Sequence, residues 1–294
     1  MRKSEQRLAY LLLGTPAVIV FSLILFPVVW NIWLAFHRVR LLDLRNLSWW
    51  QYPATLDNFV KIFTQYDFWP ALAATLIYTT GGATLALALG LIAALAVNPP
   101  FRGRGFVRGT LLIPYIAPVV AVAFAWRFIL DPRGVVMTAL LGADLMEQPI
   151  HLLGQRPWAM MSLVLFEGWR YFPFDFMFIL ARLQAIPSVL YDAAAIDGAT
   201  PVKRFFFVTL PQLKLVLATL FLLRFMWTFN KFDDVFLITR GAAGTRVLTI
   251  KVYEFLIGEF DVGAGAGMAL VLFAVLGLFL LVYFKWVMRP AEEE

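Results

Sequence analysis

The segment IPSVLYDAAAIDGATPVKRFFFVTLPQLK, residues 186–214, interrupts a largely apolar chain with small and polar residues. Ser188 follows a proline and can cap a short helix, which we expect to run to about Asp197. Gly198 then stands where a left-handed helix end is expected, because glycine adopts a positive φ without steric cost. The spacing predicts a short helix that ends in a glycine turn.

A second helix start follows this turn. Thr200 is a typical N-cap residue, and Pro201 suits the first helical position, which needs no amide hydrogen. Leu210 and Pro211 are expected to bend the start of the next apolar run. Three alanines at 193–195 give the first helix a narrow flank that another surface can approach closely. The segment therefore predicts a helix–turn–helix that docks on a second protein.

Six apolar runs set the class of protein. Of the 294 residues, 61% are hydrophobic and only 15% are charged. A helix needs about 20 apolar residues to cross a bilayer, and a helix satisfies its own backbone in lipid. The runs cover residues 11–36, 71–97, 107–130, 158–182, 209–229 and 263–288. We predict an all-α membrane protein with six transmembrane helices in a single domain, residues 1–294, and the docking segment 186–211 between the fourth and fifth spans.

Basic residues predict which side each loop faces. The loop after the second run holds Arg102, Arg104 and Arg108 without an acidic residue, and the N-terminal tail adds Arg2 and Arg7. Short cytoplasmic loops collect lysine and arginine, so we expect both termini and the docking segment in the cytoplasm. The first run is too long for a signal peptide and lacks a small-residue cleavage site, which favours a retained span.

The cysteine and histidine content limits the kinds of metal site and catalytic group that the chain can contain. The absence of cysteine excludes disulfides, thiolate metal sites and cysteine nucleophiles. The two histidines, His37 and His151, fall in predicted loops and are not at metal-ligand spacing, so zinc is not expected. We expect neither a metal nor a cofactor on this chain.

Charged residues make the fourth run, SLVLFEGWRYFPFDFMFIL, unusual. Glu167, Arg170 and Asp175 lie at membrane depth, where an isolated charge costs about 2.5–3.5 kcal/mol. Glu167 and Arg170 are three residues apart and can pair on one helix face. Two interpretations stay open, namely a self-neutralising pair between packed helices or a polar, broken helix beside a water-filled path.

The end of the fifth run, LLRFMWTFNKFDD, adds groups that suit a sugar. Aromatic rings offer flat faces for stacking, and amide groups bind hydroxyls. An anchor at the outer membrane interface explains the same aromatic and basic residues equally well. The candidate substrate-path residues are Glu167, Trp169, Arg170, Tyr171, Arg224, Trp227, Phe229 and Asn230.

The docking segment carries a recognisable signature. It resembles that of the permease subunits of binding-protein-dependent ABC importers, which reads Glu-Ala-Ala, three residues, Gly, nine residues and Ile-x-Leu-Pro. The spacing is intact here in residues 192–194, Gly198 and residues 208–211, with Asp for Glu and Val for Ile. LDNFVKIF and FLITRGAAGTRVLTIKVYEF resemble the maltose/glycerol-3-phosphate branch, although the usual Gly-Gly-Pro is replaced by residues 240–242. The resemblance covers about residues 57–288.

This resemblance implies a type I ABC importer permease fold and a mechanism. The helix at 192–198 would dock in a cytoplasmic ATPase, whose ATP-driven closure would rock the spans between inward- and outward-facing states. The implied partners are a second, different permease chain, an ATPase dimer that holds ATP and Mg²⁺, an extracytoplasmic solute-binding protein and the lipids of a bacterial inner membrane. The implied cargo is a sugar, an oligosaccharide or a related polyol. The implied ATPase-coupling residues are Tyr191, Asp192, Ala193, Ala194, Asp197, Gly198, Ala199 and Pro211.

Two other classes of function remain to be weighed. A stand-alone secondary transporter would use Glu167 and Asp175 for ion coupling, but the sequence contains no evident inverted repeat. A membrane-embedded enzyme would need a cluster of catalytic groups, which the sequence does not present. The chain also lacks the GxxxxGK[ST] motif of a nucleotide-binding loop. We therefore expect no enzymatic activity, with ATP hydrolysis on a separate subunit.

Overall fold

The computed structural model describes residues 3–46, 49–65 and 67–286, and helices dominate this part of the chain. Arg2 and the last two residues of the predicted sixth run, 287–288, lie outside the described residues. The chain divides into two compact units. The first comprises residues 1–69 and 251–275, and the second comprises residues 70–250 and 276–294.

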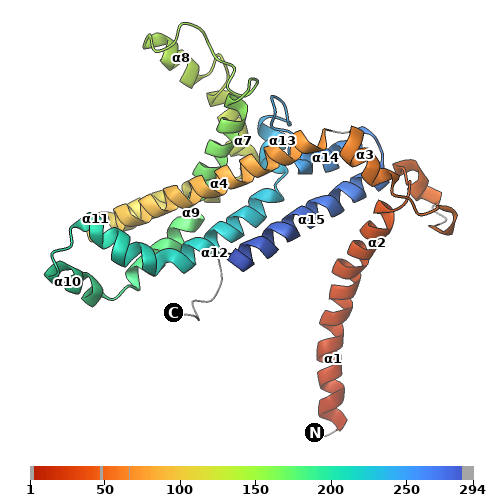
Figure 1. Ribbon diagram of the computed structural model, residues 1–294, viewed down its shortest axis with the longest axis horizontal. Coiled ribbons are helices and arrows are strands. Elements are labelled where there is room, and N and C mark those ends of the chain that lie inside the picture. Colours follow the sequence, from red (N-terminus) through yellow and green to blue (C-terminus); the bar gives the residue numbers. More distant parts are fainter. Residues whose placement is uncertain (1–2, 47–48, 66, 287–294) are drawn as a thin grey trace. The chain divides into compact units, whose positions relative to one another are not determined.

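Each unit is built from helices of very different length (Figure 1). The first unit contains α1 (Lys3–Val20), α2 (Phe26–Ala35) and α3 (Asp57–Gln65), with helical turns at Phe21–Leu25, Leu41–Asn46, Trp49–Gln51 and Glu254–Gly258. The second contains α5 (Arg104–Leu111), α6 (Ile113–Ile116), α7 (Val119–Ile129), α8 (Val135–Gly142), α9 (Trp158–Gln184), α10 (Ser188–Ile196), α11 (Pro201–Arg204), α12 (Leu210–Phe229) and α13 (Asp233–Ile238), with a π-helical turn at Phe205–Thr209. Three helices contribute residues to both units, namely α4 (Phe68–Val97), α14 (Leu248–Tyr253) and α15 (Val262–Trp286).

Four of the six predicted spans correspond to continuous helical segments, and the third and fourth lie in two bent helix pairs. Within the described residues, Tyr10–Ala35, Phe68–Val97, Pro201–Phe229 and Val262–Lys285 are long and apolar enough to cross a membrane. The predicted third span is bent by 91° at the break between Ile116 and Val119. The predicted fourth span, 158–182, lies within α9, and a bend of 67° between α9 and α10 follows it. Counting each bent pair as one span gives six. The second bend separates α10, the predicted docking helix, from the span before it.

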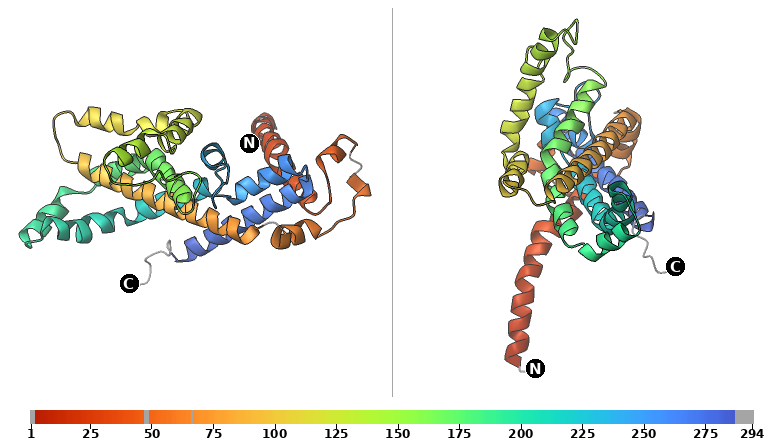
Figure 2. Two further views of the ribbon diagram at one scale, coloured as in Figure 1. Left: turned by 90° about the horizontal axis from the view of Figure 1, so that it is seen from above. Right: turned by 90° about the vertical axis from the view of Figure 1, so that its left-hand side faces the viewer.

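Glycines on α4 allow it to approach α9 closely in the second unit (Figures 1 and 2). A Cβ atom on Gly82 would lie 2.5 Å from Cγ of Glu167, and one on Gly90 would lie 2.8 Å from Cβ of Asp175. Small residues at a helix interface are a recurrent feature of membrane proteins, because lipid provides no hydrophobic force between helices. Close packing of α4 thus covers the two acidic positions of the fourth span.

Apolar side chains of α4, α9 and α12 form the main core of the second unit. Ala94 and Val97 of α4 pack with Phe176 and Ile179 of α9 and with Leu213 of α12. This core lies toward the end of the helices that leads into α10 and α11 (Figure 1). The helices on either side of the docking segment, α9 and α12, are therefore held together by one apolar core.

Asn58 organises the first unit. Its side-chain amide donates hydrogen bonds to the carbonyls of Ala35 and His37, both at 2.9 Å, where α2 ends. Val39 accepts a further backbone bond from Gly263 at the start of α15, at 2.9 Å. These contacts satisfy backbone groups that the end of α2 leaves free.

Candidate functional site

The docking segment forms the predicted helix and glycine turn. Gly198 has a φ of +75°. Its amide donates to the carbonyl of Ala195 at 3.0 Å, and the amide of Ala199 donates to that of Ala194 at 2.8 Å. This pair of bonds is the Schellman motif, in which a left-handed residue closes a helix. The expected role of Ser188 is wrong, because Pro187 occupies the N-cap position and Ser188 is already the first helical residue.

The second helix begins at Thr200 as predicted. The Thr200 hydroxyl accepts from the amide of Lys203 at 3.4 Å, and Pro201 occupies the first helical position. The helical segment runs through Pro211 without a break, from residue 201 to 229, and the bend expected there stays a prediction. A π-helical turn at Phe205–Thr209 lies directly before the proline. Such a wide turn accommodates the proline ring and the hydrogen bond that it removes.

The segment presents its small residues to the outside. Asp192, Ala193, Asp197 and Gly198 are exposed, as is Pro211. A Cβ atom added to Gly198 would meet nothing within 4 Å. The surface around the turn is therefore open to another molecule.

Internal contacts fix the position of α10 relative to the following helix. The hydroxyl groups of Tyr191 and Thr209 are 3.0 Å apart and share a hydrogen bond. Arg204 donates from Nε to the carbonyl of Ala199 at 2.9 Å. The two helices of the docking segment can thus move as one piece, which is what transmission of a partner's movement requires.

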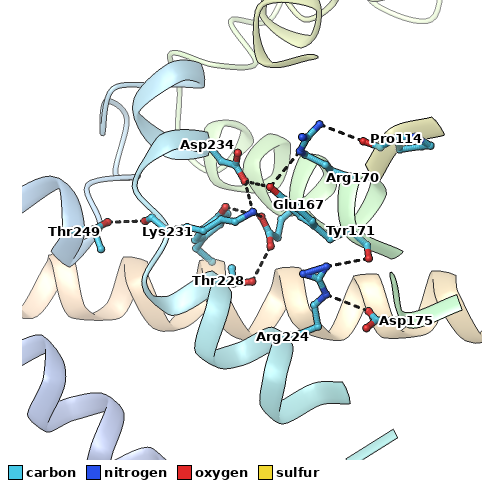
Figure 3. Close-up of polar contacts among 11 residues, drawn as sticks. Pro114, Glu167, Arg170, Tyr171, Asp175, Arg224, Thr228, Lys231, Asp234 and Thr249 are labelled. Carbon is cyan, nitrogen blue, oxygen red and sulfur yellow. Dashed lines mark hydrogen bonds and ion pairs between the residues drawn. The ribbon is translucent and has the colours of Figure 1, made fainter. Parts of the chain in front are cut away.

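A buried polar network lies between the helices of the second unit, centred on Glu167 (Figure 3). Glu167 is only 1% exposed. Its carboxylate accepts from the Tyr78 hydroxyl at 2.9 Å and from the Thr228 hydroxyl at 2.7 Å. The ammonium of Lys231 lies 3.4 Å from the same carboxylate. The Glu167 carboxylate thus links α4, α9 and α12 with Lys231, two residues after the end of α12.

Lys231 connects this carboxylate to α13. Its ammonium lies 2.8 Å from Oδ2 of Asp234, which also accepts from the Tyr171 hydroxyl at 3.3 Å. Burial raises the pKa of Asp234 to about 6, although the Lys231 charge acts in the opposite direction. Burial alone would lower the pKa of Lys231, but Glu167 and Asp234 outweigh it and hold that pKa above its usual value. The network therefore favours a charged lysine shared by two acids.

The predicted pair between Glu167 and Arg170 does not form, because Arg170 has other partners. Its guanidinium donates to the carbonyls of Pro114 at 3.2 Å and Ala117 at 2.8 Å, beside the break in the third span. Pro118 has no amide hydrogen to donate back to Pro114. A carbonyl left free in a membrane segment costs several kcal/mol, so it recruits the long side chain of Arg170.

Asp175 is paired with Arg224 of α12. Their charged atoms are 3.5 Å apart, and both side chains are at most 2% exposed. The Arg224 guanidinium also donates to the carbonyl of Tyr171 at 3.0 Å and lies 4.7 Å from the centre of its ring. This ion pair reduces the cost of burying the two charges, but both oxygens of Asp175 and Nε of Arg224 have no hydrogen-bond partner within the described residues.

The network and this pair together are electrically balanced. The six charged residues of this cluster are three acids, Glu167, Asp175 and Asp234, and three bases, Arg170, Arg224 and Lys231; Arg224 and Lys231 lie beside the acids, whereas Arg170 binds backbone carbonyls. Neither interpretation of the fourth span holds as stated, because Glu167 pairs with Lys231 and not with Arg170, and α9 runs without a break from Trp158 to Gln184.

The candidate substrate-path residues divide into buried and accessible groups. Glu167, Arg170, Arg224 and Phe229 are buried. The remaining four are at least partly accessible, namely Trp169, Tyr171, Trp227 and Asn230. The ring of Trp227, 44% exposed, packs edge-on against Phe174 with 5.1 Å between centroids. The accessible groups are mainly aromatic, as the sugar hypothesis requires.

Sequence reasoning missed four members of the network, namely Tyr78, Thr228, Lys231 and Asp234, and it missed the break in the third span. Tyr78 and Thr228 look like ordinary residues of apolar spans, and only the fold brings them to Glu167. Asp234 lies three residues after Lys231, which was a usable signal for a pair. Pro118 was the signal for the break that Arg170 covers.

Comparison with known proteins identifies the family. The family described as binding-protein-dependent transport system inner membrane component matches residues 86–289. "Inner membrane ABC transporter permease protein YcjO" of Escherichia coli K12 is 34% identical over 281 residues, which cover 93% of this chain and 92% of that protein. "Trehalose/maltose transport system permease protein MalF" of Thermococcus litoralis is 30% identical over 286 residues, covering 97% of this chain and 95% of that protein.

A solved structure has the same fold. The crystal structure of a bacterial ABC transporter involved in the import of the acidic polysaccharide alginate contains a chain that matches with a TM-score of 0.83 at 20% identity, covering 98% of each chain. The predicted all-α importer permease fold is confirmed. On its sequence, the chain belongs to the family of binding-protein-dependent transport system inner membrane components.

Proposed function

We propose that this multi-pass inner-membrane chain is a permease subunit that carries a carbohydrate through an ATP-driven, binding-protein-dependent importer. It would act as one permease domain over residues 1–294 and form half of the translocation path, with both termini in the cytoplasm. The observation that carries the proposal is the docking segment, a rigid helix pair with an open left-handed glycine turn.

The docking segment would couple transport to a partner's ATP. A partner can shift a membrane protein between two states only through contacts that differ between those states. An exposed α10 seated in a moving groove meets this condition. The coupling residues proposed are Tyr191, Asp192, Ala193, Ala194, Asp197, Gly198, Ala199 and Pro211. ATP and Mg²⁺ would be held by a cytoplasmic ATPase dimer, and this chain would have no catalytic residue, cofactor or metal of its own.

The carbohydrate cargo is supported by the relatives and by the accessible aromatic rings. Relatives include a trehalose/maltose permease protein and "Galactooligosaccharides transport system permease protein GanP" of Bacillus subtilis, 28% identical over 284 residues. We propose that Trp169, Tyr171, Trp227 and Asn230 touch the sugar. Glu167, Arg170, Arg224 and Phe229 would support the path from behind, because they are buried.

Family membership favours this function over a stand-alone secondary transporter. Both carboxylates that ion coupling would use, Glu167 and Asp175, already face cations of their own chain. A second permease, different from this one, and an extracytoplasmic solute-binding protein would complete the assembly.

Purification of the tagged chain from its native membrane in mild detergent tests the proposal. We expect an ATPase and a second polytopic chain to copurify, as identified by mass spectrometry. The solute-binding protein of the same assembly would then bind a sugar in a ligand screen. Isolation of this chain alone in a form that transports solute would refute the proposal.

A further inference from the structure

A basic loop and the helix α5 that follows it form a second candidate site, apart from the network and the docking segment. Residues 98–130 contain Arg102, Arg104 and Arg108 among their four arginines and no acidic residue. Phe106 lies between Arg104 and Arg108 and is 81% exposed. Exposed aromatic and basic residues on one short helix are typical of a segment that lies at a membrane surface.

Two of these arginines are anchored to the end of α4. Arg104 donates to the carbonyl of Asn98 at 3.2 Å, and Arg108 donates from Nη2 to the carbonyl of Val97 at 3.1 Å. Cationic side chains are favourable where a helix ends, because the last carbonyls carry partial negative charge. Both guanidinium groups are therefore held in place before any ligand arrives.

Arg108 retains an unused donor. Its Nε atom is buried and has no hydrogen-bond partner within the described residues. A buried donor without a partner costs about 1–3 kcal/mol. Because Nε is covered by the protein, a ligand would have to accept from the part of the guanidinium that lines the adjacent cavity.

A cavity of about 270 Å³ lies beside this arginine. Arg108 and Leu112 line it on one side, and Met177, Ala181 and Gln184 of α9 line it on the other. The cavity thus combines one cation with a largely apolar wall. Met177 and Ala181 are exposed, so the wall continues onto the surface of α9.

We propose that this cavity binds the headgroup of an anionic phospholipid of the cytoplasmic leaflet. The phosphate would accept from Arg108, and an acyl chain would lie along the exposed apolar residues of α9. Basic pockets between helices on the cytoplasmic side bind anionic headgroups, and the charge of this loop complements them. A free anion would make no favourable contact with the apolar wall, whereas the acyl chain of a lipid would, so a lipid is the occupant that fits. α9 leads directly into α10, so the lipid would lie at the base of the docking segment.

Native mass spectrometry of the chain, with the proteins that copurify with it, tests the proposal. The delipidated protein is titrated with dioleoyl phosphatidylglycerol and, separately, with dioleoyl phosphatidylcholine. We expect the first phosphatidylglycerol to bind about tenfold more tightly, which corresponds to about 1.4 kcal/mol. Arg108→Gln should abolish this preference. Arg102→Gln is the matched control, because it removes the same charge from the same loop but does not line the cavity.

A second variant guards against misfolding of Arg108→Gln, since Arg108 also binds α4. Ala181→Trp fills the mouth of the cavity and leaves every arginine in place, and it should abolish the preference as well. Equal affinity of the wild type for both lipids would overturn the proposal. So would an equal loss in Arg102→Gln, which would mean attraction to loop charge alone. Displacement of the lipid by millimolar inorganic phosphate would identify a soluble-anion site instead.

Discussion

Replacement of Lys231 by methionine probes the buried network most directly. Methionine replaces the aliphatic part of the side chain with an unbranched chain of equal length and removes the charged ammonium. Glu167 and Asp234, whose carboxylates lie 3.4 Å and 2.8 Å from the ammonium, lose their shared cation. Both acids are buried. Removal of one partner from a buried ion pair costs about 3–5 kcal/mol, so we expect the free energy of unfolding to fall by about 4 kcal/mol.

The assay is unfolding of the purified chain in mixed micelles with increasing dodecyl sulfate, followed by tryptophan fluorescence. Lys61→Met is the matched control, because Lys61 pairs with Asp261 at 3.4 Å but its side chain is 34% exposed. A half-exposed pair of this kind contributes about 0–1 kcal/mol. The two lysine variants should therefore differ by about 3 kcal/mol.

A rescue experiment separates charge from packing. The triple variant Glu167→Gln, Lys231→Met, Asp234→Asn contains no charge at the network centre and keeps polar groups for Tyr78 and Thr228. It should regain most of the lost stability, because no uncompensated carboxylate remains. A loss no larger than that of Lys61→Met would refute the reasoning. A triple variant as unstable as Lys231→Met would assign the effect to packing.

The packing and the accessible surface lead to three further predictions. Gly90→Ala should lower the free energy of unfolding by about 1–3 kcal/mol, because its Cβ would lie 2.8 Å from Cβ of Asp175. Gly277→Ala is the control, because the space around Gly277 is open, and equal effects of the two variants would contradict close packing of α4. Trp227→Ala should lower sugar uptake while the same partners still copurify; unchanged uptake would move the substrate path elsewhere. Arg170→Gln should destabilise the chain by about 1–3 kcal/mol, because carbonyls beside the broken span lose their donor, and wild-type stability would count against this role.

The docking segment was predictable because its structure is determined locally. Gly198 has a left-handed φ, and Thr200 caps the following helix, as their positions in the sequence indicated. The local rule for helix caps failed at Ser188, where two residues compete for the cap position. Ser188 is a good cap, but Pro187 holds the extended conformation that the cap position needs. At Pro211 a π-helical turn directly precedes the proline, and the helical segment continues through it to residue 229.

The buried network was only half predictable. Charges at membrane depth required partners, and the sequence identified Glu167, Arg170 and Asp175 as the residues that needed them. The choice of partner depended on contacts distant in sequence. Glu167 binds Thr228, which is 61 residues away, and Arg170 binds Pro114, which is 56 residues away. Proximity on one helix favoured a pair between them, but backbone carbonyls beside the break competed successfully for the arginine.

We expect this chain to transport a carbohydrate only when a partner ATPase acts through the docking segment. ATP-dependent uptake of the sugar into proteoliposomes, with the copurified assembly and its loaded binding protein, tests this claim most directly. Gly198→Val should abolish uptake while ATP is still hydrolysed, because a branched residue resists a φ of +75° at the docking turn. Gly103→Val, at a φ of +85° in the basic loop, should retain uptake. Uptake without ATP, or undiminished uptake by Gly198→Val, would contradict the account.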